Sequence, residues 1–217
     1  MDESKDLLVE LGLEELPHEI VYPTLRDFRE LFTAGLSNAR IGFADVREYS
    51  TPRRIALYIR KVRTRQEDYT EEKKGPSLEK AYDENGGPSK ALQGFLKGNG
   101  VSLKDVTERK TDNGDYIFLV RRIQGKDTAG ILPSVLDETI GSLRFRKSMR
   151  WEKSGFAFAR PVRWIVFLFG NDVIPYEIAG VRSGRLTRGH RTYRREAVEI
   201  FSPEEYEQIY YQEQTFA

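Results

Sequence analysis

The stretch TERKTDNGDYIFLVRRI, residues 107–123, carries the strongest local folding signal in this chain. Asn113-Gly114 is a residue pair that two-residue turns between antiparallel strands prefer, because both turn positions need left-handed backbone conformations. Residues 107–110 precede this turn, and residues 116–123, which follow it, are rich in the aromatic and β-branched side chains typical of strands. The stretch therefore predicts a β-hairpin.

A second apolar stretch, VRWIVFLFGNDVIPYEI at residues 162–178, predicts another hairpin across Gly170-Asn171-Asp172. Side chains alternate between the two faces of a strand, so Val162, Trp164 and Val166 are expected to share one face. We expect Trp164 to be a core residue rather than a platform on which bases stack.

The spacing of apolar residues predicts the remaining elements, because strands repeat every two residues and helices about every 3.6. The expected strands cover residues 7–11, 46–50 and 55–59, and the expected helices cover residues 20–32, 91–96 and 128–143. Residues 63–75 are polar without an apolar period and are expected to form an exposed loop. Since the clearest strand pairings are local hairpins, the predicted class is α+β, with largely antiparallel sheets and packed helices.

We expect one domain over residues 1–200, which includes a basic segment at residues 144–195. A capping box and a proline at the first helical position predict that a helix begins at Ser202-Pro203-Glu204-Glu205. This helix has no stop signal before the sequence ends. Residues 201–217 are therefore expected to start a helix that leads into a missing C-terminal part of a longer protein.

Composition argues against several kinds of site. The chain has 217 residues, with 35 Lys and Arg against 34 Asp and Glu, no Cys, and two His, which are His18 and His190. The absence of Cys excludes disulfides, thiolate zinc sites and cysteine nucleophiles, and two distant His cannot form a His-rich metal site. We find no P-loop, no Ser/His/Asp arrangement and no convincing carboxylate pair. We therefore predict neither a catalytic residue nor a metal site in this chain.

The sequence also predicts a cytoplasmic protein without a membrane segment. No apolar run approaches the ~20 residues that a membrane-spanning helix needs. The start, MDESKDLLVELG, is acidic and lacks the basic and apolar regions of a signal peptide.

Positive charge is concentrated in residues 144–195, although the formal net charge of the whole chain is only +1. Only Glu152, Asp172 and Glu177 oppose the basic residues of this segment, which are Arg144, Arg146, Lys147, Arg150, Lys153, Arg160, Arg163, Arg182, Arg185, Arg188, Arg191, Arg194 and Arg195. Planar guanidinium groups suit phosphates, and aromatic faces can stack on bases. This segregation of charge favours a polyanion as partner, and RNA in particular.

The candidate RNA-binding residues lie in four basic motifs, and each motif has an ordinary structural alternative. The candidates are Arg53, Arg54, Lys147, Arg150, Arg160, Arg163, Arg188, His190 and Arg191. The turn at residues 51–54 could be only a solvated turn, Trp151 could anchor a basic loop to the core, and His190 could be polar surface. We expect the Arg53–Arg54 turn and the 188–191 loop to lie on the surface, because no partner for their charges is near in sequence.

Taken together and in order, the motifs resemble those of the bacterial glycyl-tRNA synthetase beta subunit, near its N-terminal end. The resemblance rests on LLVELGLEELP at residues 7–17, TPRR at 51–54, GPS at 75–77, AYD at 81–83, GPSKA at 87–91, GF at 94–95, KSMRW at 147–151, FARPVRW at 158–164 and TRGHR at 187–191. Any one of these motifs alone would be weak, but they span nearly the whole chain.

The resemblance implies a class II synthetase assembled from two alpha and two beta chains. ATP, Mg²⁺ and glycine would be handled by the alpha subunit, so that no cofactor is expected on this fragment. The expected partners are the alpha subunit, tRNA(Gly) and the second beta chain. The implied fold is similar to the B3/B4 module of the phenylalanyl-tRNA synthetase beta chain.

Three functions remain open from the sequence. The chain could handle tRNA within a glycine-tRNA ligase, it could scaffold the alpha chain without contacting RNA, or it could be an editing hydrolase. Editing ranks lowest, because glycine is the smallest amino acid and a size-excluding pocket has little need of hydrolytic proofreading. An exposed, contiguous arginine face would favour RNA binding, whereas arginines buried against carboxylates would favour scaffolding.

Overall fold

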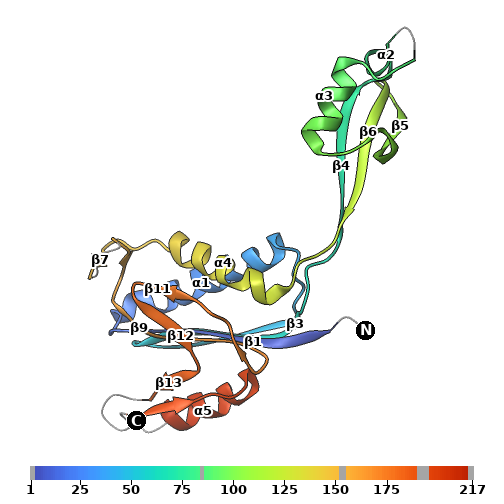
Figure 1. Ribbon diagram of the computed structural model, residues 1–217. Coiled ribbons are helices and arrows are strands. Elements are labelled where there is room, and N and C mark those ends of the chain that lie inside the picture. The colour runs from blue at the N-terminus through green and yellow to red at the C-terminus, as the bar shows by residue number, and fades with distance from the viewer. Residues whose placement is uncertain (1–2, 84–85, 152–154, 190–195, 215–217) are drawn as a thin grey trace. The chain divides into compact units, whose positions relative to one another are not determined.

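The computed structural model describes residues 3–83, 86–151, 155–189 and 196–214 (Figure 1). The chain divides into two compact units. Unit 1 consists of Met1–Gln66 and Lys126–Ala217, and unit 2 consists of Glu67–Gly125. The single domain expected over residues 1–200 is therefore interrupted by unit 2, which has an apolar cluster of its own.

Unit 1 is built around a seven-stranded sheet with the order β11-β12-β9-β1-β3-β2, in which β10 also pairs with β9. Its strands are β1 Ser4–Leu13, β2 Asp45–Thr51, β3 Arg54–Arg63, β9 Val162–Phe169, β10 Asp172–Val173, β11 Glu177–Ile178 and β12 Val181–Gly184. All pairs are antiparallel except β12 with β9. β1 lies at the centre, where it pairs with β3 on one side and with β9 on the other.

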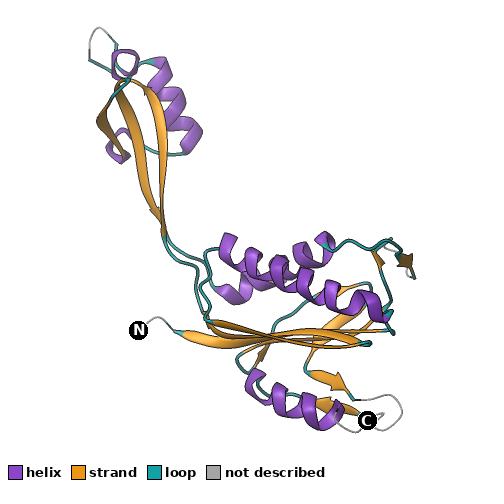
Figure 2. Ribbon diagram, turned by 180° about the vertical axis from the view of Figure 1, so that it is seen from behind, coloured by secondary structure: helices purple, strands orange, loops and turns teal. Residues whose placement is uncertain are grey.

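Two helices cover one face of this sheet (Figures 1 and 2): α1, His18–Asn38, and α4, Thr128–Ser142. Apolar side chains such as Phe28 and Phe32 of α1 pack with α4 and with the strands in the largest buried cluster of the protein. Helix α1 begins at His18, and Pro23 lies inside it. We call this side of the sheet the helix face.

The opposite side, which we call the α5 face, is covered by α5, Tyr206–Gln214, and by the small β13–β14 pair (Figure 2). The two strands of this pair are Leu186–Arg188 and Ala197–Glu199, and a 3₁₀ turn, Pro203–Glu205, precedes α5. Tyr206 is fully buried here. The helix expected within residues 201–217 is therefore packed on the sheet of unit 1.

Alternation along the central strand β1 supplies both faces of the sheet. Leu7, Val9 and Leu11 belong to the cluster on the helix face, whereas Leu8 belongs to the cluster on the α5 face. Glu10 follows the same alternation as Leu8 and is completely buried on the α5 face. A strand that is buried on both faces usually consists of consecutive apolar residues. Glu10 is the one charged residue in the run LLVEL.

Trp164 is a core residue on the α5 face, as expected, but Val162 does not share its face. In the pairing of β1 with β9, Leu13 lies opposite Val162 and Gly12 opposite Trp164, so that Arg163 is an extra residue between them. This irregularity shifts the alternation by one residue. Val162 consequently packs in the cluster on the helix face.

The second predicted hairpin is shorter than expected. β9 turns at Gly170, which has a φ of 56°, into β10, and β10 pairs with β9 over only two residues. Glu177–Ile178, which was expected to continue the hairpin, pairs instead with Arg182 and Val181. A second short antiparallel pair is formed by β7, Met149–Arg150, and β8, Ala157–Phe158.

Unit 2 is a three-stranded antiparallel sheet with the order β4-β6-β5 and short helices. Its elements are β4 Tyr69–Ser77, α2 Leu78–Ala81, α3 Lys90–Asn99, a 3₁₀ turn Leu103–Asp105, β5 Val106–Thr111 and β6 Gly114–Ile123. The predicted hairpin is confirmed, but its two turn residues are Asp112 and Asn113, and Gly114, with a φ of 108°, already pairs with Thr111. Helix α3 ends at Gly100, which is left-handed with a φ of 64°.

The exposed loop expected over residues 63–75 is wrong for most of its length, because β4 occupies Tyr69–Ser77. Its polar side chains pair across the sheet, since Arg121 Nε donates to Glu71 at 2.5 Å and Arg109 Nη1 donates to Glu72 at 2.8 Å. Cross-strand ion pairs of this kind stabilise a strand without an apolar period. The α+β class with mostly antiparallel sheets is confirmed.

Candidate nucleic-acid interface

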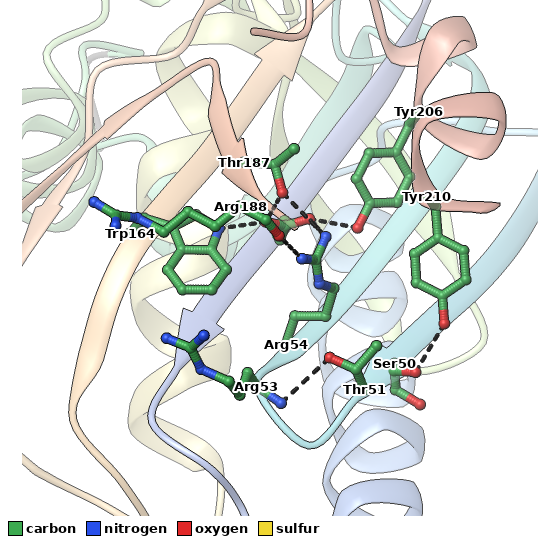
Figure 3. A network of polar contacts seen from close by, with 10 residues as sticks. Ser50, Thr51, Arg53, Arg54, Trp164, Thr187, Arg188, Tyr206 and Tyr210 are labelled. Atoms are coloured by element: carbon green, nitrogen blue, oxygen red, sulfur yellow. Dashed lines mark hydrogen bonds and ion pairs between the residues drawn. The ribbon is translucent and has the colours of Figure 1, made fainter. Parts of the chain in front are cut away.

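Four of the motifs found in the sequence meet at one end of the main sheet. Backbone hydrogen bonds join the segment after β1 to the β2–β3 turn and to the start of β9. Leu13 N donates to Arg53 O at 2.7 Å, Leu16 N donates to Pro52 O at 2.7 Å, and Glu14 N donates to Pro161 O at 3.0 Å. β13 carries the fourth motif and is held at the same end of the sheet by side-chain contacts, among them the hydrogen bond from Arg54 to Thr187 (Figure 3).

The centre of these contacts is the buried carboxylate of Glu10. It accepts hydrogen bonds from the Arg54 guanidinium at 3.1 Å, from the Thr187 hydroxyl at 2.6 Å, and from the Trp164 indole and the Tyr206 hydroxyl (Figure 3). Thr187 also accepts from Arg54 Nη1 at 3.0 Å. One carboxylate thus links strands β1, β3, β9 and β13 to helix α5.

The prediction that Arg54 lies on the surface is wrong. Only 2% of the residue is exposed, and its guanidinium pairs with Glu10 and donates to the carbonyl of Arg188. Burial is the largest influence on the pKa of Arg54 and lowers it, but Glu10, Tyr206 and Tyr210 together outweigh burial, so that the pKa is raised. Arg54 is therefore a structural residue that fixes β13, and it is removed from the list of RNA-binding candidates.

The Trp164 ring lies among three arginines, which are Arg53, Arg188 and the buried Arg54, whose guanidinium carbon is 5.8 Å from the indole centroid. The guanidinium carbon of Arg53 is 5.8 Å from the indole centroid and that of Arg188 is 6.0 Å from it. In Figure 3 both guanidinium groups point away from the Arg54 guanidinium. Arg188 is exposed and Arg53 is half-buried, and neither forms an ion pair with a carboxylate among the residues that the structure describes.

Gly12 allows Trp164 to adopt this position. A Cβ atom at residue 12 would lie 1.9 Å from ring atoms of Trp164, which is far inside van der Waals contact. The indole therefore lies directly on the backbone of β1, with only 7% of the residue exposed. Both arginines are held beside a ring that cannot move toward the sheet.

Two further candidates, Arg160 and Arg163, lie at the same end of the sheet but have partners within the protein. Arg163 Nε donates to Glu14 at 2.6 Å, and Arg160 Nε donates to the carbonyl of Glu15 at 3.1 Å. About half of the Arg163 side chain remains exposed. These two arginines secure the segment after β1 and retain donors that point to solvent.

Lys147 and Arg150 do not join this group. They lie on or beside β7, whose hairpin Figure 1 shows apart from β13. Both side chains are exposed, and Arg150 Nε donates to the carbonyl of Gly155 at 3.0 Å. Trp151 contacts Phe156 edge to face and packs on the main core, as the alternative interpretation of this motif expected.

Other arginines of the basic segment form ion pairs on the surface. Arg182 pairs with Glu177 at 2.7 Å, and Arg185 approaches Glu199 at 3.9 Å. His190 and Arg191, both predicted to bind RNA, lie outside the described residues. Among the described residues, the positive charge of this segment is thus partly neutralised within the fold, and the cations without a carboxylate partner include Arg188 and those at residues 144–150.

Sequence reasoning missed Glu10, Thr187 and Tyr206 as a structural centre. The signal that could have found it is the single carboxylate inside the apolar run of residues 7–11, since a buried charge needs a partner. No cluster of three or more side chains suited to a metal ion was found among the described residues, and no helix in that part of the chain is long and apolar enough to cross a membrane.

Comparison with known proteins identifies the family. The family model described as glycyl-tRNA synthetase beta subunit matches residues 7–217. The chain belongs to this family. The glycine–tRNA ligase beta subunits of Syntrophus aciditrophicus (strain SB) and Desulfitobacterium hafniense (strain Y51) are each 41% identical to it, and that of Desulforamulus reducens is 38% identical. Each comparison covers 94% of this chain but only 29% of the relative, so the chain spans less than a third of these beta subunits.

Proposed function

We propose that this part of a glycyl-tRNA synthetase beta subunit supplies a surface that holds tRNA(Gly) during glycylation. The observation that carries the proposal is the pair of guanidinium groups, Arg53 and Arg188, beside the fixed Trp164 ring. Guanidinium groups donate in a planar fork that matches phosphate oxygens, and they lose little entropy when their stems are already held. Both arginines belong to backbone segments that the Glu10 network orders.

A second group of cations supports the same proposal. Arg144, Arg146, Lys147 and Arg150 are all exposed between the end of α4 and β7. Arg144 and Arg150 donate to main-chain carbonyls, and none of the four forms an ion pair with a carboxylate among the described residues. Two separate cationic groups on one unit suit an extended polyanion such as RNA, whose phosphates repeat along the chain.

We infer that the reacting groups of the ligase lie elsewhere. The alpha subunit would handle ATP, Mg²⁺ and glycine, and this chain would act within a tetramer of two alpha and two beta chains. The described residues contribute cations, aromatic rings and buried structural contacts to the proposed interface. Such groups bind and orient RNA, and they need no bound cofactor to do so.

The alternative function is a scaffold for the alpha chain, and one observation favours it. Arg163, Arg182 and Arg185 pair with Glu14, Glu177 and Glu199 within the fold. If the remaining cations meet carboxylates of the alpha chain, their removal would weaken assembly of the subunits and leave RNA affinity unchanged.

The test replaces Arg53, Arg188 or Lys147 by Ala in the complete two-subunit enzyme and measures tRNA affinity at several salt concentrations. We expect weaker tRNA binding, unchanged affinity for glycine and ATP, and a salt slope that is flatter by somewhat less than ~1 per lost phosphate contact. Arg182→Ala is the matched control, because this arginine is 85% exposed but pairs with Glu177. Unchanged tRNA affinity and salt slope in assembled, well-folded variants would contradict the proposal.

A further inference from the structure

The two faces of the unit 2 sheet differ in what covers them. Ile117 of β6 packs with Leu92 of α3 and Ala81 of α2, and Phe95 of α3 lies against Gly75 of β4. Figure 2 shows α3 along this side of the three strands. The other side, which we call the open face, carries alternate residues of β6 together with their cross-strand neighbours on β4 and β5.

Strand pairing defines the open face. Tyr116, Phe118, Val120 and Arg122 are alternate residues of β6 and therefore share one side of the sheet. Phe118 lies opposite Lys74 of β4, and Tyr116 lies opposite Arg109 of β5. The open face thus combines two aromatic rings with three cations, Lys74, Arg109 and Arg122.

The cations lie on or near the rings. Lys74 Nζ is 3.4 Å from the centroid of the Tyr116 ring, and the guanidinium carbon of Arg109 is 5.0 Å from that of Phe118. Arg109 reaches across β6 to pair with Glu72 at 2.8 Å, and Arg122 pairs with Asp68 at 3.0 Å. Long flexible side chains, rather than packed secondary structure, therefore cover the rings.

This chemistry is not that of a core face. Val120 is 37% exposed and Tyr116 is half-buried, so apolar and aromatic surface reaches solvent at these two residues. Phe118 is only 7% exposed, with the Arg109 guanidinium beside its ring. Lys74, Arg109 and Arg122 outnumber Glu72 and Asp68, the two carboxylates that pair with them, and the remaining positive charge favours an anionic partner. Flat aromatic groups on a sheet, bordered by cations, are the features that bind unpaired bases and their phosphates.

We propose that the open face of unit 2 binds single-stranded RNA, with unpaired bases stacked on Tyr116 and Phe118 and with phosphates paired to Lys74, Arg109 and Arg122. Lys74 and Arg109 move from the rings to the phosphates when a base takes their place. The inference takes RNA as partner from the proposed function, but it concerns another unit, another surface and an unpaired form of RNA.

The test uses the 217-residue chain and a fluorescently labelled uridine decamer, with an RNA duplex of the same length for comparison. We expect the chain to bind the decamer more tightly than the duplex. Tyr116→Leu should weaken decamer binding about tenfold, because one base then loses its stacking partner. Tyr116→Phe keeps the ring and should retain the affinity. Lys74→Ala should weaken binding and flatten its salt dependence, whereas Lys97→Ala, an exposed cation of α3, should change neither.

Circular dichroism and thermal unfolding show whether each variant is folded, and the leucine at position 116 keeps an apolar side chain where alanine would leave a gap. The inference is overturned if the chain does not bind the decamer, or if folded Tyr116→Leu and Lys74→Ala chains bind it as tightly as the unchanged chain does. Binding of a poly-glutamate peptide as strong as that of the decamer and independent of Tyr116 would also overturn it.

Unit 1 variants separate this inference from the proposed function. Arg53→Ala and Arg188→Ala chains should still bind the decamer. Dependence of decamer binding on Tyr116, with no effect of Arg53 or Arg188 on tRNA affinity in the complete enzyme, would support the open face and contradict the unit 1 proposal. Decamer binding that does not depend on Tyr116, together with weaker tRNA binding of the Arg53 or Arg188 variants, would contradict the open face and support the unit 1 proposal.

Discussion

The two faces of the main sheet bury side chains of different chemistry. The helix face holds an apolar cluster that includes Phe28, Phe32 and Leu57. The α5 face holds a smaller apolar cluster in which Glu10 and Arg54 are buried together. Apolar burial depends on area and has no direction, whereas each hydrogen bond to Glu10 requires one partner in one place.

This difference suggests separate roles for the two faces. The helix face buries most of the apolar surface of unit 1 and is the main source of its stability. On the α5 face, burying a charge pair adds little net stability, because desolvation offsets the attraction. We infer that the Glu10 network instead selects one arrangement of β13 and α5, which keeps Arg53 and Arg188 beside Trp164.

The largest effect is expected for Glu10→Ala. The substitution leaves the Arg54 charge buried without its partner, which should lower the free energy of unfolding by about 3–5 kcal/mol. Adding Arg54→Met should recover part of this loss, because the stranded charge is then removed as well. Denaturant unfolding followed by tryptophan fluorescence measures both variants. Simple addition of the two losses would contradict the inferred role of the pair.

On the helix face, Leu57→Ala should cost about 2–5 kcal/mol, since it leaves a cavity in a fully buried apolar cluster. No second substitution is expected to rescue it, because no charge is stranded. The same unfolding experiment applies. A loss below about 1 kcal/mol would mean that this face is loosely packed and would remove the contrast between the two faces.

A smaller effect is expected for Tyr206→Phe, which removes one donor to Glu10 but leaves the Arg54 pair intact. The expected loss is about 1–3 kcal/mol, with faster hydrogen exchange in α5. Tyr210→Phe is the control, because the Tyr210 hydroxyl donates to the half-buried carbonyl of Ser50 at 2.8 Å and does not touch Glu10. Equal effects of the two substitutions would show that the network does not anchor α5.

The smallest effect is a dependence on alkaline pH that is centred on the α5 face. Burial raises the pKa of Tyr49 from 10.0 to about 12, and it also raises the pKa values of Tyr58 and Tyr206. Between the unfolded and folded pKa values the native state binds more protons, so stability falls as the pH rises above 10 and is fully present below it.

Tyr58→Phe should make this alkaline fall in stability shallower, because one raised pKa is removed. Tyrosinate absorbance and thermal unfolding, measured together across this pH range, follow ionisation and stability in the same sample. Stability that stays constant from pH 10 to 12 would contradict the prediction.

Local signals explain which elements the sequence could predict. Asn113-Gly114 specifies its hairpin, and Ser89 and Gly100 bound α3 with a side-chain cap and a left-handed residue. The exposed positions of Lys147 and Arg188 also follow from their polar surroundings in sequence. β4 was missed because its cross-strand partners, such as Arg121 for Glu71, are 50 residues away.

The prediction that Arg54 lies on the surface was wrong for the same reason, because its partners are distant in sequence. The partners of Glu10 lie 44, 154, 177 and 196 residues away, at Arg54, Trp164, Thr187 and Tyr206. No local pattern can connect groups at such distances, because each of them has an ordinary interpretation within its own segment.

By itself, the sequence determined the α+β class, most of the helices and strands, the family and the cationic character of residues 144–195. These depend on periodicity, turn chemistry and motif order, all of which are local properties. Only the tertiary structure decided which arginines are free to meet a ligand. A buried charge must be paired to avoid the cost of desolvation, and which carboxylate is near enough to pair with it is set by the packing of distant segments.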